Sequence, residues 1–116
     1  NQDFSCFLSE NTMLPMIYID DAIQSIWKIM KAKKNQIKIK SSYNLAAFSI
    51  TPKMIASELK KIRSDFHINY NPDFRQKIAD SWPNSINDDN ARKDWGWKKN
   101  FDLEETVNEM INKMKK

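Results

Sequence analysis

A nine-residue stretch decides the fold of this chain: Leu14-Pro15-Met16-Ile17-Tyr18-Ile19-Asp20-Asp21-Ala22. Residues 16–19 are apolar or aromatic without a polar break, which predicts a short buried strand. Asp20 or Asp21 is expected to be the N-cap of the following helix, because a carboxylate there accepts hydrogen bonds from free backbone N–H groups. That helix is predicted to run to about residue 33. A strand that leads directly into a helix indicates an α/β fold.

The rest of the chain alternates in the same way, and no internal repeat or linker divides it. Further strands or extended segments are predicted at residues 4–8, 37–40, 43–46 and 66–70. Further helices are predicted from Pro52 with Thr51 as N-cap, over residues 90–95 before Gly96, and from Leu103 with Asp102 as N-cap. The stretch between the last strand and the second of these helices, residues 71–87, is expected to be irregular. We therefore predict a single small α/β domain over residues 1–116.

Apolar residues recur at helical spacing in the first and the last predicted helix, so each helix has one apolar side. In the first helix this stripe consists of Ile19, Ile23, Ile26, Trp27 and Met30. In the last helix it consists of Leu103, Val107, Met110, Ile111 and Met114. We expect a thin core, because short chains bury a smaller share of their surface than long ones.

The counts of glycine, cysteine and histidine exclude several kinds of site. Gly96 is the single glycine, so the chain holds neither the glycine-rich loop of a dinucleotide-binding fold nor a P-loop. Cys6 is the single cysteine, which excludes an intrachain disulfide and a zinc site built on several thiolates. His67 is the single histidine, which excludes a histidine-cluster metal site, and it is expected to point outward. We assign no catalytic, cofactor-binding or metal-binding residue.

Charge is unevenly distributed along the chain, whose formal net charge is +4. Residues 31–63 hold eight lysines, one arginine and one glutamate, a net charge of +8. Such a segment can bind nucleic acid or an anionic membrane, but no nucleic-acid-binding motif accompanies it. We interpret it as a solvated surface and expect neither partner. A basic binding module without catalysis is the alternative from another class, and salt-sensitive retention on heparin would support it.

The sequence carries no signal for a membrane or for secretion. No apolar run approaches the ~20 residues that cross a bilayer, and no basic region leads into an apolar segment at the N-terminus. A free cysteine fits a reducing compartment, so a cytoplasmic location is expected. The chain begins at Asn1 without an initiator methionine, and we expect it to be part of a longer protein.

Three segments resemble known proteins. Leu14–Ala22 resembles the segment in which extended short-chain dehydrogenases/reductases place an Arg-Asp pair, a hydrophobic strand and an aspartate before a helix. Asp88–Lys98, with its Gly96-Trp97 dipeptide, is similar to the C-terminal pattern of that family. The most specific string resembles L-threonine 3-dehydrogenases of the short-chain type: Pro72-Asp73-Phe74-Arg75-Gln76-Lys77-Ile78-Ala79-Asp80-Ser81-Trp82-Pro83. The resemblance covers essentially the whole chain.

The resemblance implies a small C-terminal substrate-binding domain of the family, α/β in class and without its Rossmann part. NAD and the catalytic centre would belong to that other part. No Tyr-x-x-x-Lys motif begins at Tyr43, because Ala47 occupies the fourth following position. The intact parent is expected to be a homodimer that oxidises L-threonine to 2-amino-3-ketobutyrate with NAD. This chain alone is expected to be inactive and to pack against its own Rossmann domain.

One departure from the family pattern concerns the substrate. Relatives that act on nucleotide sugars carry Arg-Asp where this chain has Leu14-Pro15, and such an arginine suits a diphosphate through forked, charged hydrogen bonds. An amino acid substrate needs no such group, so the departure favours threonine. The equivalent domain of a nucleotide-sugar epimerase/dehydratase is the alternative.

Trp82 is the principal candidate for binding substrate, because a large aromatic in a polar loop is unusual and loops concentrate binding residues. We expect it to close over bound threonine, with Thr12 and Leu14 nearby on the opposite wall. A tryptophan that only covers the core is the alternative. Arg75 and Asp80 are further candidates for substrate contact, although for these two we favour a mutual pair that stabilises the loop.

Overall fold

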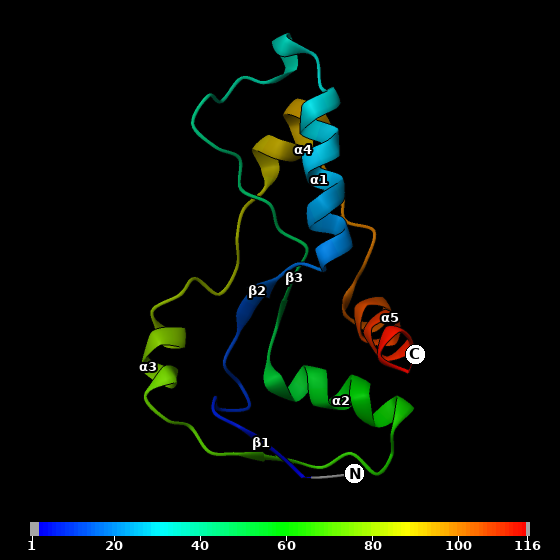
Figure 1. Ribbon diagram of the computed structural model, residues 1–116. Coiled ribbons are helices and arrows are strands. Elements are labelled where there is room, and N and C mark those ends of the chain that lie inside the picture. The colour runs from blue at the N-terminus through cyan, green and yellow to red at the C-terminus, as the bar shows by residue number, and fades with distance from the viewer. Residues whose placement is uncertain (1–2, 116) are drawn as a thin grey trace.

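Ten elements of secondary structure follow one another in the computed structural model, which describes residues 3–115 (Figure 1). They are β1 (Phe4–Cys6), β2 (Leu14–Met16), α1 (Ile19–Lys31), the short 3-10 helix η1 (Lys34–Gln36), β3 (Phe48–Ile50), α2 (Pro52–Ile62), β4 (Ile68–Tyr70), α3 (Arg75–Asp80), α4 (Asp89–Trp95) and α5 (Leu103–Met114). The chain is flat and extended, 52 × 35 × 17 Å, with a radius of gyration of 16.9 Å. A compact domain of this length has a radius of about 13 Å. The predicted α/β class is confirmed.

The strands of residues 3–115 form two small sheets of two strands each. β1 pairs in parallel with β4, with Phe4 opposite Ile68. β2 pairs in antiparallel fashion with β3, with Leu14 opposite Ile50. α2 connects the second sheet back to the first and packs against α5 (Figure 1). Both strands of the parallel pair agree with the sequence-based prediction, although each is shorter than expected.

The start of α1 differs from the prediction. Its N-cap is Tyr18, without a side-chain cap, and Asp20 and Asp21 lie inside the first turn. The prediction of an aspartate N-cap is therefore wrong, and β2 ends three residues earlier than the predicted strand. Acidic side chains in the first turn still stabilise the helix through its dipole. Asp21 is fully buried, and its carboxylate accepts hydrogen bonds from the backbone N–H groups of Asn100 and Phe101.

The large apolar side of α1 faces solvent. The buried positions of the helix are Asp21 and Ser25, both polar. The predicted apolar stripe is present, but its side chains are 46–70% exposed: Ile19, Ile23, Ile26, Trp27 and Met30. We call these five residues the α1 face. A helix normally buries its apolar stripe against other protein, so this arrangement leaves an apolar surface without a partner among residues 3–115.

A cluster of the hydrophobic core lies between α1 and α4. Its buried residues are Ala91, Trp95 and Trp97. Partly buried side chains from α1 and from two loops pack against them: Ile17, Ile29, Ala32, Tyr43 and Leu45. The Trp95 and Tyr43 rings meet edge to face with centroids 5.7 Å apart, a favourable aromatic geometry. This small cluster agrees with the expectation of a thin core.

The extended segments predicted at residues 37–40 and 43–46 do not form strands. The hydroxyl of Tyr43 accepts hydrogen bonds from the backbone N–H groups of Lys38 (3.0 Å) and Ile39 (3.2 Å). The indole N–H of Trp97 donates to the carbonyl of residue 46 at 3.2 Å. These backbone groups therefore bond to side chains instead of a neighbouring strand. The alternating pattern of the sequence does not reveal this competition.

Three other predicted helix ends are confirmed, at Thr51, Gly96 and Asp102. The Thr51 hydroxyl accepts from the N–H of Met54, and the Asp102 carboxylate accepts from the N–H of Glu105. Gly96 ends α4 in the left-handed conformation with φ of 73°. The N–H of Gly96 then donates to the carbonyl of residue 92, which is the hydrogen bond of the αL capping motif, and the N–H of residue 97 donates to the carbonyl of residue 91.

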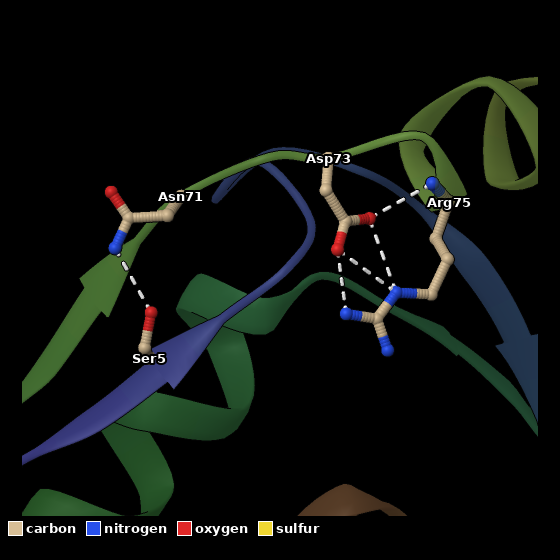
Figure 2. Close-up of polar contacts among 4 residues, drawn as sticks. All are labelled: Ser5, Asn71, Asp73 and Arg75. Carbon is tan, nitrogen blue, oxygen red and sulfur yellow. Dashed lines mark hydrogen bonds and ion pairs between the residues drawn. The ribbon is translucent and has the colours of Figure 1, made fainter.

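The segment predicted to be irregular contains α3. The Asp73 carboxylate accepts a hydrogen bond from the backbone N–H of Arg75 at 2.9 Å, which occupies a donor that the first turn of the helix leaves free (Figure 2). The helix has only six residues, and its apolar residues do not mark a buried stripe. For this reason the periodicity of the sequence did not indicate it.

Candidate substrate-binding site

A hydrogen-bonded cluster joins α3 to the loop between β1 and β2. The side-chain amide of Gln76 lies at its centre: its oxygen accepts from the backbone N–H of Ser9 at 2.7 Å. The amide nitrogen donates to the hydroxyl of Thr12 at 2.9 Å and to the carboxylate of Asp80 at 2.7 Å. The Ser9 and Thr12 hydroxyls are also 2.7 Å apart. We call these four residues the Gln76 cluster.

The neighbours of Gln76 determine which way its amide points. A backbone N–H only donates and an ionised carboxylate only accepts. The amide oxygen must therefore face Ser9, and the amide nitrogen must face Asp80. Because Thr12 is buried, water competes poorly for its contact with the amide. The cluster therefore connects two segments that are more than sixty residues apart in the sequence, and its partners fix the orientation of the Gln76 amide.

Arg75 pairs with a residue outside the Gln76 cluster. Its guanidinium forms a forked pair with Asp73, with Nη2 at 2.6 Å from Oδ2 and Nε at 3.1 Å from both oxygens (Figure 2). The same group stacks over the Phe7 ring at 3.5 Å from its centroid. Hydrogen bonds from Arg75 lower the pKa of the Asp73 carboxyl, and the pKa of Arg75 is raised by the same bond. The expected pairing of Arg75 with Asp80 is therefore wrong, since each has a nearer partner.

Trp82 follows α3 by two residues, and its side chain is 55% exposed. Phe74 and Ile78 are also exposed, and the three lie four residues apart. On a helix and its continuation this spacing places side chains on one side, so α3 presents an apolar ridge of Phe74, Ile78 and Trp82. The ridge includes the tryptophan, so the alternative that Trp82 covers the core is not supported in residues 3–115.

Leu14 and Thr12 border an apolar cavity of about 380 Å³. The cavity lies among both sheets and α2, and Leu14 is buried there beside its strand partner Ile50. Trp82, Arg75 and Asp80 do not line it. The structure therefore brings Thr12 and α3 together through Gln76, but it does not place Trp82 across this cavity from Leu14. Contact of these residues with substrate remains a prediction.

Gln76 is the residue that sequence reasoning missed. It stands inside the most specific string of the sequence, next to Arg75 and four residues before Asp80. The spacing of four places Gln76 and Asp80 on one side of a helix, where their side chains meet. That signal was hidden because the segment was expected to be irregular.

Residues 3–115 contain neither a group of side chains that could bind a metal ion nor a helix that could cross a membrane. No three His, Cys, Asp or Glu side chains come close enough to bind a metal ion. None of the described helices is both long and apolar enough to cross a membrane. His67 is exposed, as expected, and Cys6 is buried with a free thiol.

Comparison with known sequences identifies relatives over nearly the whole chain. No family model matches it. It is 45% identical over 113 residues to the mitochondrial L-threonine 3-dehydrogenase of Bos taurus, an alignment that covers 97% of this chain and 30% of that protein. It is 38% identical over 101 residues to an uncharacterized epimerase/dehydratase of Staphylococcus haemolyticus, which covers 86% of this chain and 32% of that protein.

Solved structures agree with the sequence comparison. A GalE-like L-threonine dehydrogenase from Cupriavidus necator in its apo form superposes with a TM-score of 0.94 and 42% identity, covering 97% of this chain and 41% of that one. An L-threonine dehydrogenase from Phytophthora infestans superposes with a TM-score of 0.93 and 38% identity, covering 97% of this chain and 36% of that one. The chain belongs to the extended short-chain dehydrogenases/reductases.

This extended short-chain dehydrogenase/reductase chain corresponds to the C-terminal part of the family fold. It spans 30–32% of the length of the curated relatives named above. The resemblance identified from its sequence is therefore confirmed, both for the family and for the C-terminal position.

Proposed function

We propose that this chain is the substrate-side part of an NAD-dependent L-threonine 3-dehydrogenase. The parent enzyme oxidises the 3-hydroxyl of threonine to give 2-amino-3-ketobutyrate, with NAD as the hydride acceptor. The observation that carries the proposal is the likeness, over almost the whole chain, to L-threonine dehydrogenases from Bos taurus, Cupriavidus necator and Phytophthora infestans.

The exposed surface supports a further polypeptide part. The chain exposes 8419 Å², whereas a compact monomer of 13.7 kDa exposes about 6,600 Å². The difference of about 1,800 Å² exceeds the ~800 Å² that each partner buries in a standard interface. The α1 face lies within this surface. We expect the Rossmann part of the parent to cover it.

The residues of this chain do not fit a site for NAD. Its single glycine, Gly96, ends α4 and belongs to no phosphate-binding loop. The hydroxyl of Tyr43 already donates to Asp94 at 2.8 Å and accepts from two backbone N–H groups, and Ala47 replaces the lysine that a Tyr-x-x-x-Lys motif needs. We therefore assign no hydride or proton transfer to this chain. It is inactive alone in this proposal.

Within the proposal this chain supplies one wall of the threonine site. Trp82 closes over the substrate from the exposed end of α3. Thr12 connects that end, through Gln76, to the apolar region that Leu14 borders. Arg75 and Asp80 each have a partner close in sequence, so we expect them to hold the segment in place instead of contacting threonine.

The alternative is the equivalent domain of a nucleotide-sugar epimerase/dehydratase. The relative from Staphylococcus haemolyticus, whose name gives no substrate, is compatible with it. Leu14 disfavours a nucleotide-sugar substrate, because a buried leucine beside Ile50 supplies no charge to bind a diphosphate. A basic binding module is the third possibility, and the long likeness to dehydrogenases makes it the least favoured.

Two properties of the parent remain part of the proposal. We expect a homodimer, and we expect a reducing compartment, the cytoplasm, because Cys6 is a free thiol. The name of the bovine relative places that protein in mitochondria. Gel filtration of the intact parent and fractionation of its source cells would test both.

A chimeric enzyme tests the function directly. The part of the Cupriavidus necator enzyme that this chain does not match is joined to this chain in place of its own C-terminal part. We expect net reduction of NAD with L-threonine. With UDP-glucose we expect no conversion of the sugar, which is followed directly because an epimerase or dehydratase returns the hydride to its substrate and gives no net NADH. A second chimera, built with the corresponding segment of the Phytophthora infestans enzyme, controls for the junction. If this control is active while the chimera with our chain folds but does not oxidise threonine, the proposal is wrong.

A further inference from the structure

We infer that Gln76 is the positioning residue for Trp82: it fixes α3, and with it the tryptophan, against the loop that carries Thr12. The inference rests on the proposed function, because it names the residue that orients the proposed threonine wall. Gln76 itself is not assigned any contact with substrate. Four hydrogen-bonding contacts of one side chain carry the inference, at distances of 2.7–3.2 Å.

α3 needs an external support. A six-residue helix is far shorter than the ~12–15 residues that an isolated helix needs for stability in water. The large apolar residues of α3 and its flanks are all more than half exposed, so they bury little apolar area: Phe74, Ile78 and Trp82. Ala79 is its only buried residue, and an alanine side chain buries little apolar area. The position of α3 therefore depends on polar contacts.

These contacts act at two ends of the segment. At the N-terminal end, the backbone N–H of Asp73 donates to the carbonyl of Phe7, and Arg75 stacks over the Phe7 ring. At the C-terminal end, Gln76 reaches Asp80, which is the last residue of α3. The backbone N–H of Trp82 donates to the carbonyl of residue 79 within the same final turn. The end that bears Trp82 is thus the end that Gln76 fixes.

The other side of the Gln76 cluster is anchored in the rest of the fold. The backbone N–H of Thr12 donates to the carbonyl of Ser9, which closes the turn. The carbonyl of Glu10 accepts from the N–H of Lys53 in the first turn of α2. β2 begins two residues after Thr12 and pairs with β3. Gln76 therefore connects a marginal helix to a loop that both α2 and the β2–β3 sheet hold in place.

The chain itself provides the first test. All four tryptophans are replaced by 5-fluorotryptophan, and the fluorine resonance of Trp82 is assigned with a Trp82→Phe variant. In Gln76→Leu, which is one bond shorter and removes both hydrogen-bonding atoms, we expect the Trp82 resonance to shift and sharpen as α3 loosens. The resonances of Trp95 and Trp97 should stay unchanged, which verifies that the core is folded.

Lys77→Leu is the matched control, because it introduces the same side chain at the neighbouring exposed position. It should leave the Trp82 resonance where it is. A Trp82 resonance that is unchanged in Gln76→Leu, or changed equally in Lys77→Leu, overturns the inference. Neither outcome depends on enzyme activity.

The chimeric enzyme gives the second test. Gln76→Leu should lower kcat/KM for threonine about tenfold and leave KM for NAD within twofold. Gln76→Glu preserves the shape but removes the amide hydrogens and places a carboxylate against Asp80. It should lower kcat/KM for threonine at least as much as Gln76→Leu. A value equal to that of the unmodified chimera counts against the inference.

The two proposals fail in distinguishable ways. An inactive chimera beside an active control contradicts the proposed function, and the fluorine measurement then decides the inference alone. If Trp82→Ala lowers kcat/KM for threonine while Gln76→Leu does not, the function stands and the positioning role of Gln76 is wrong.

Discussion

The carboxylate of Asp21 and the backbone N–H of Phe101 are 3.0 Å apart, although eighty residues separate them in the sequence. The same carboxylate accepts from the N–H of Asn100 at 3.0 and 3.1 Å. Asp21 is fully buried, so these hydrogen bonds compensate its loss of water. This contact ties the first turn of α1 to the segment that leads into α5.

Replacement of Asp21 by alanine should therefore destabilise the fold strongly. Two backbone donors lose a charged acceptor, and we expect a loss of about 2–3 kcal/mol in the free energy of unfolding. Urea denaturation followed by circular dichroism measures it. Asp20→Ala is the control, since Asp20 is partly exposed with only a 3.5 Å ion pair to Lys113, and it should cost less than about 0.5 kcal/mol. Equal losses for both variants would contradict the role of Asp21.

The isolated chain should neither bind NAD nor oxidise threonine. The physical reason is the lack of a phosphate-binding loop, since Gly96 is the single glycine and it ends a helix. Isothermal titration with NAD should give no heat of binding, and an assay with threonine should show no reduction of NAD. Stoichiometric binding in the calorimeter would show that the nucleotide site is not confined to the other part of the parent.

The α1 face should make the isolated chain self-associate. Large exposed apolar side chains on one helix form a patch that water disfavours. In sedimentation velocity, we expect the average mass to rise with protein concentration. Ile26→Glu should shift the chain toward monomer, whereas Gln24→Glu, also exposed on α1, should not. A monomer at all concentrations with a high, concentration-independent Tm would refute this expectation.

Trp82→Ala in the chimeric enzyme should lower kcat/KM for threonine by roughly ten- to a hundredfold, or about 1.4–2.7 kcal/mol of transition-state stabilisation. The affinity for NAD should hardly change, because we place NAD on the other part. The kcat/KM of Trp82→Phe should lie between that of the unmodified chimera and that of Trp82→Ala. Since Trp82 is 55% exposed, its removal should cost little stability. A variant that loses stability but keeps kcat/KM would show that Trp82 has a structural role.

The pair of Asp73 and Arg75 should respond to acid. Hydrogen bonds from Arg75 lower the pKa of the Asp73 carboxyl in the folded chain, so protonation opposes the folded state. Any stability from the pair is present above the ordinary carboxyl pKa of about 3.9 and disappears as the pH falls through the lowered pKa. The carbon-13 titration of Asp73 should have its midpoint below that value. Arg75→Gln should move the midpoint upward, and an unmoved midpoint would contradict the pairing.

Local signals in the sequence determined where several helices begin and end. Thr51 and Asp102 cap their helices because a short polar side chain next to a free backbone N–H needs no distant partner. Gly96 ends α4 because the left-handed conformation there suits a residue without a Cβ atom. The specific string around Arg75 and Trp82 likewise identified the family, which the comparisons confirmed.

Hydrogen bonds between residues far apart in the sequence determined the roles of Asp21 and Tyr43, which the sequence could not indicate. Asp21 is an acceptor for residues near position 100 and not a helix cap. The Tyr43 hydroxyl accepts hydrogen bonds from the backbone N–H groups of Lys38 and Ile39, which a strand would have used for pairing. The alternating segment of residues 37–40 is therefore irregular. In both cases a polar group has several possible partners, and the fold brings one of them within hydrogen-bonding distance.

For the candidate site, too, the sequence indicated some features and the tertiary structure decided others. The sequence by itself determined the residue types of the site, namely Thr12 and the string that contains Arg75, Asp80 and Trp82. Only the tertiary structure revealed that Gln76 joins them, and that Arg75 pairs with Asp73 instead of Asp80. It also decided that the apolar stripe of α1 remains exposed. The physical reason is that helical spacing determines which residues share a side, whereas burial depends on what protein lies opposite.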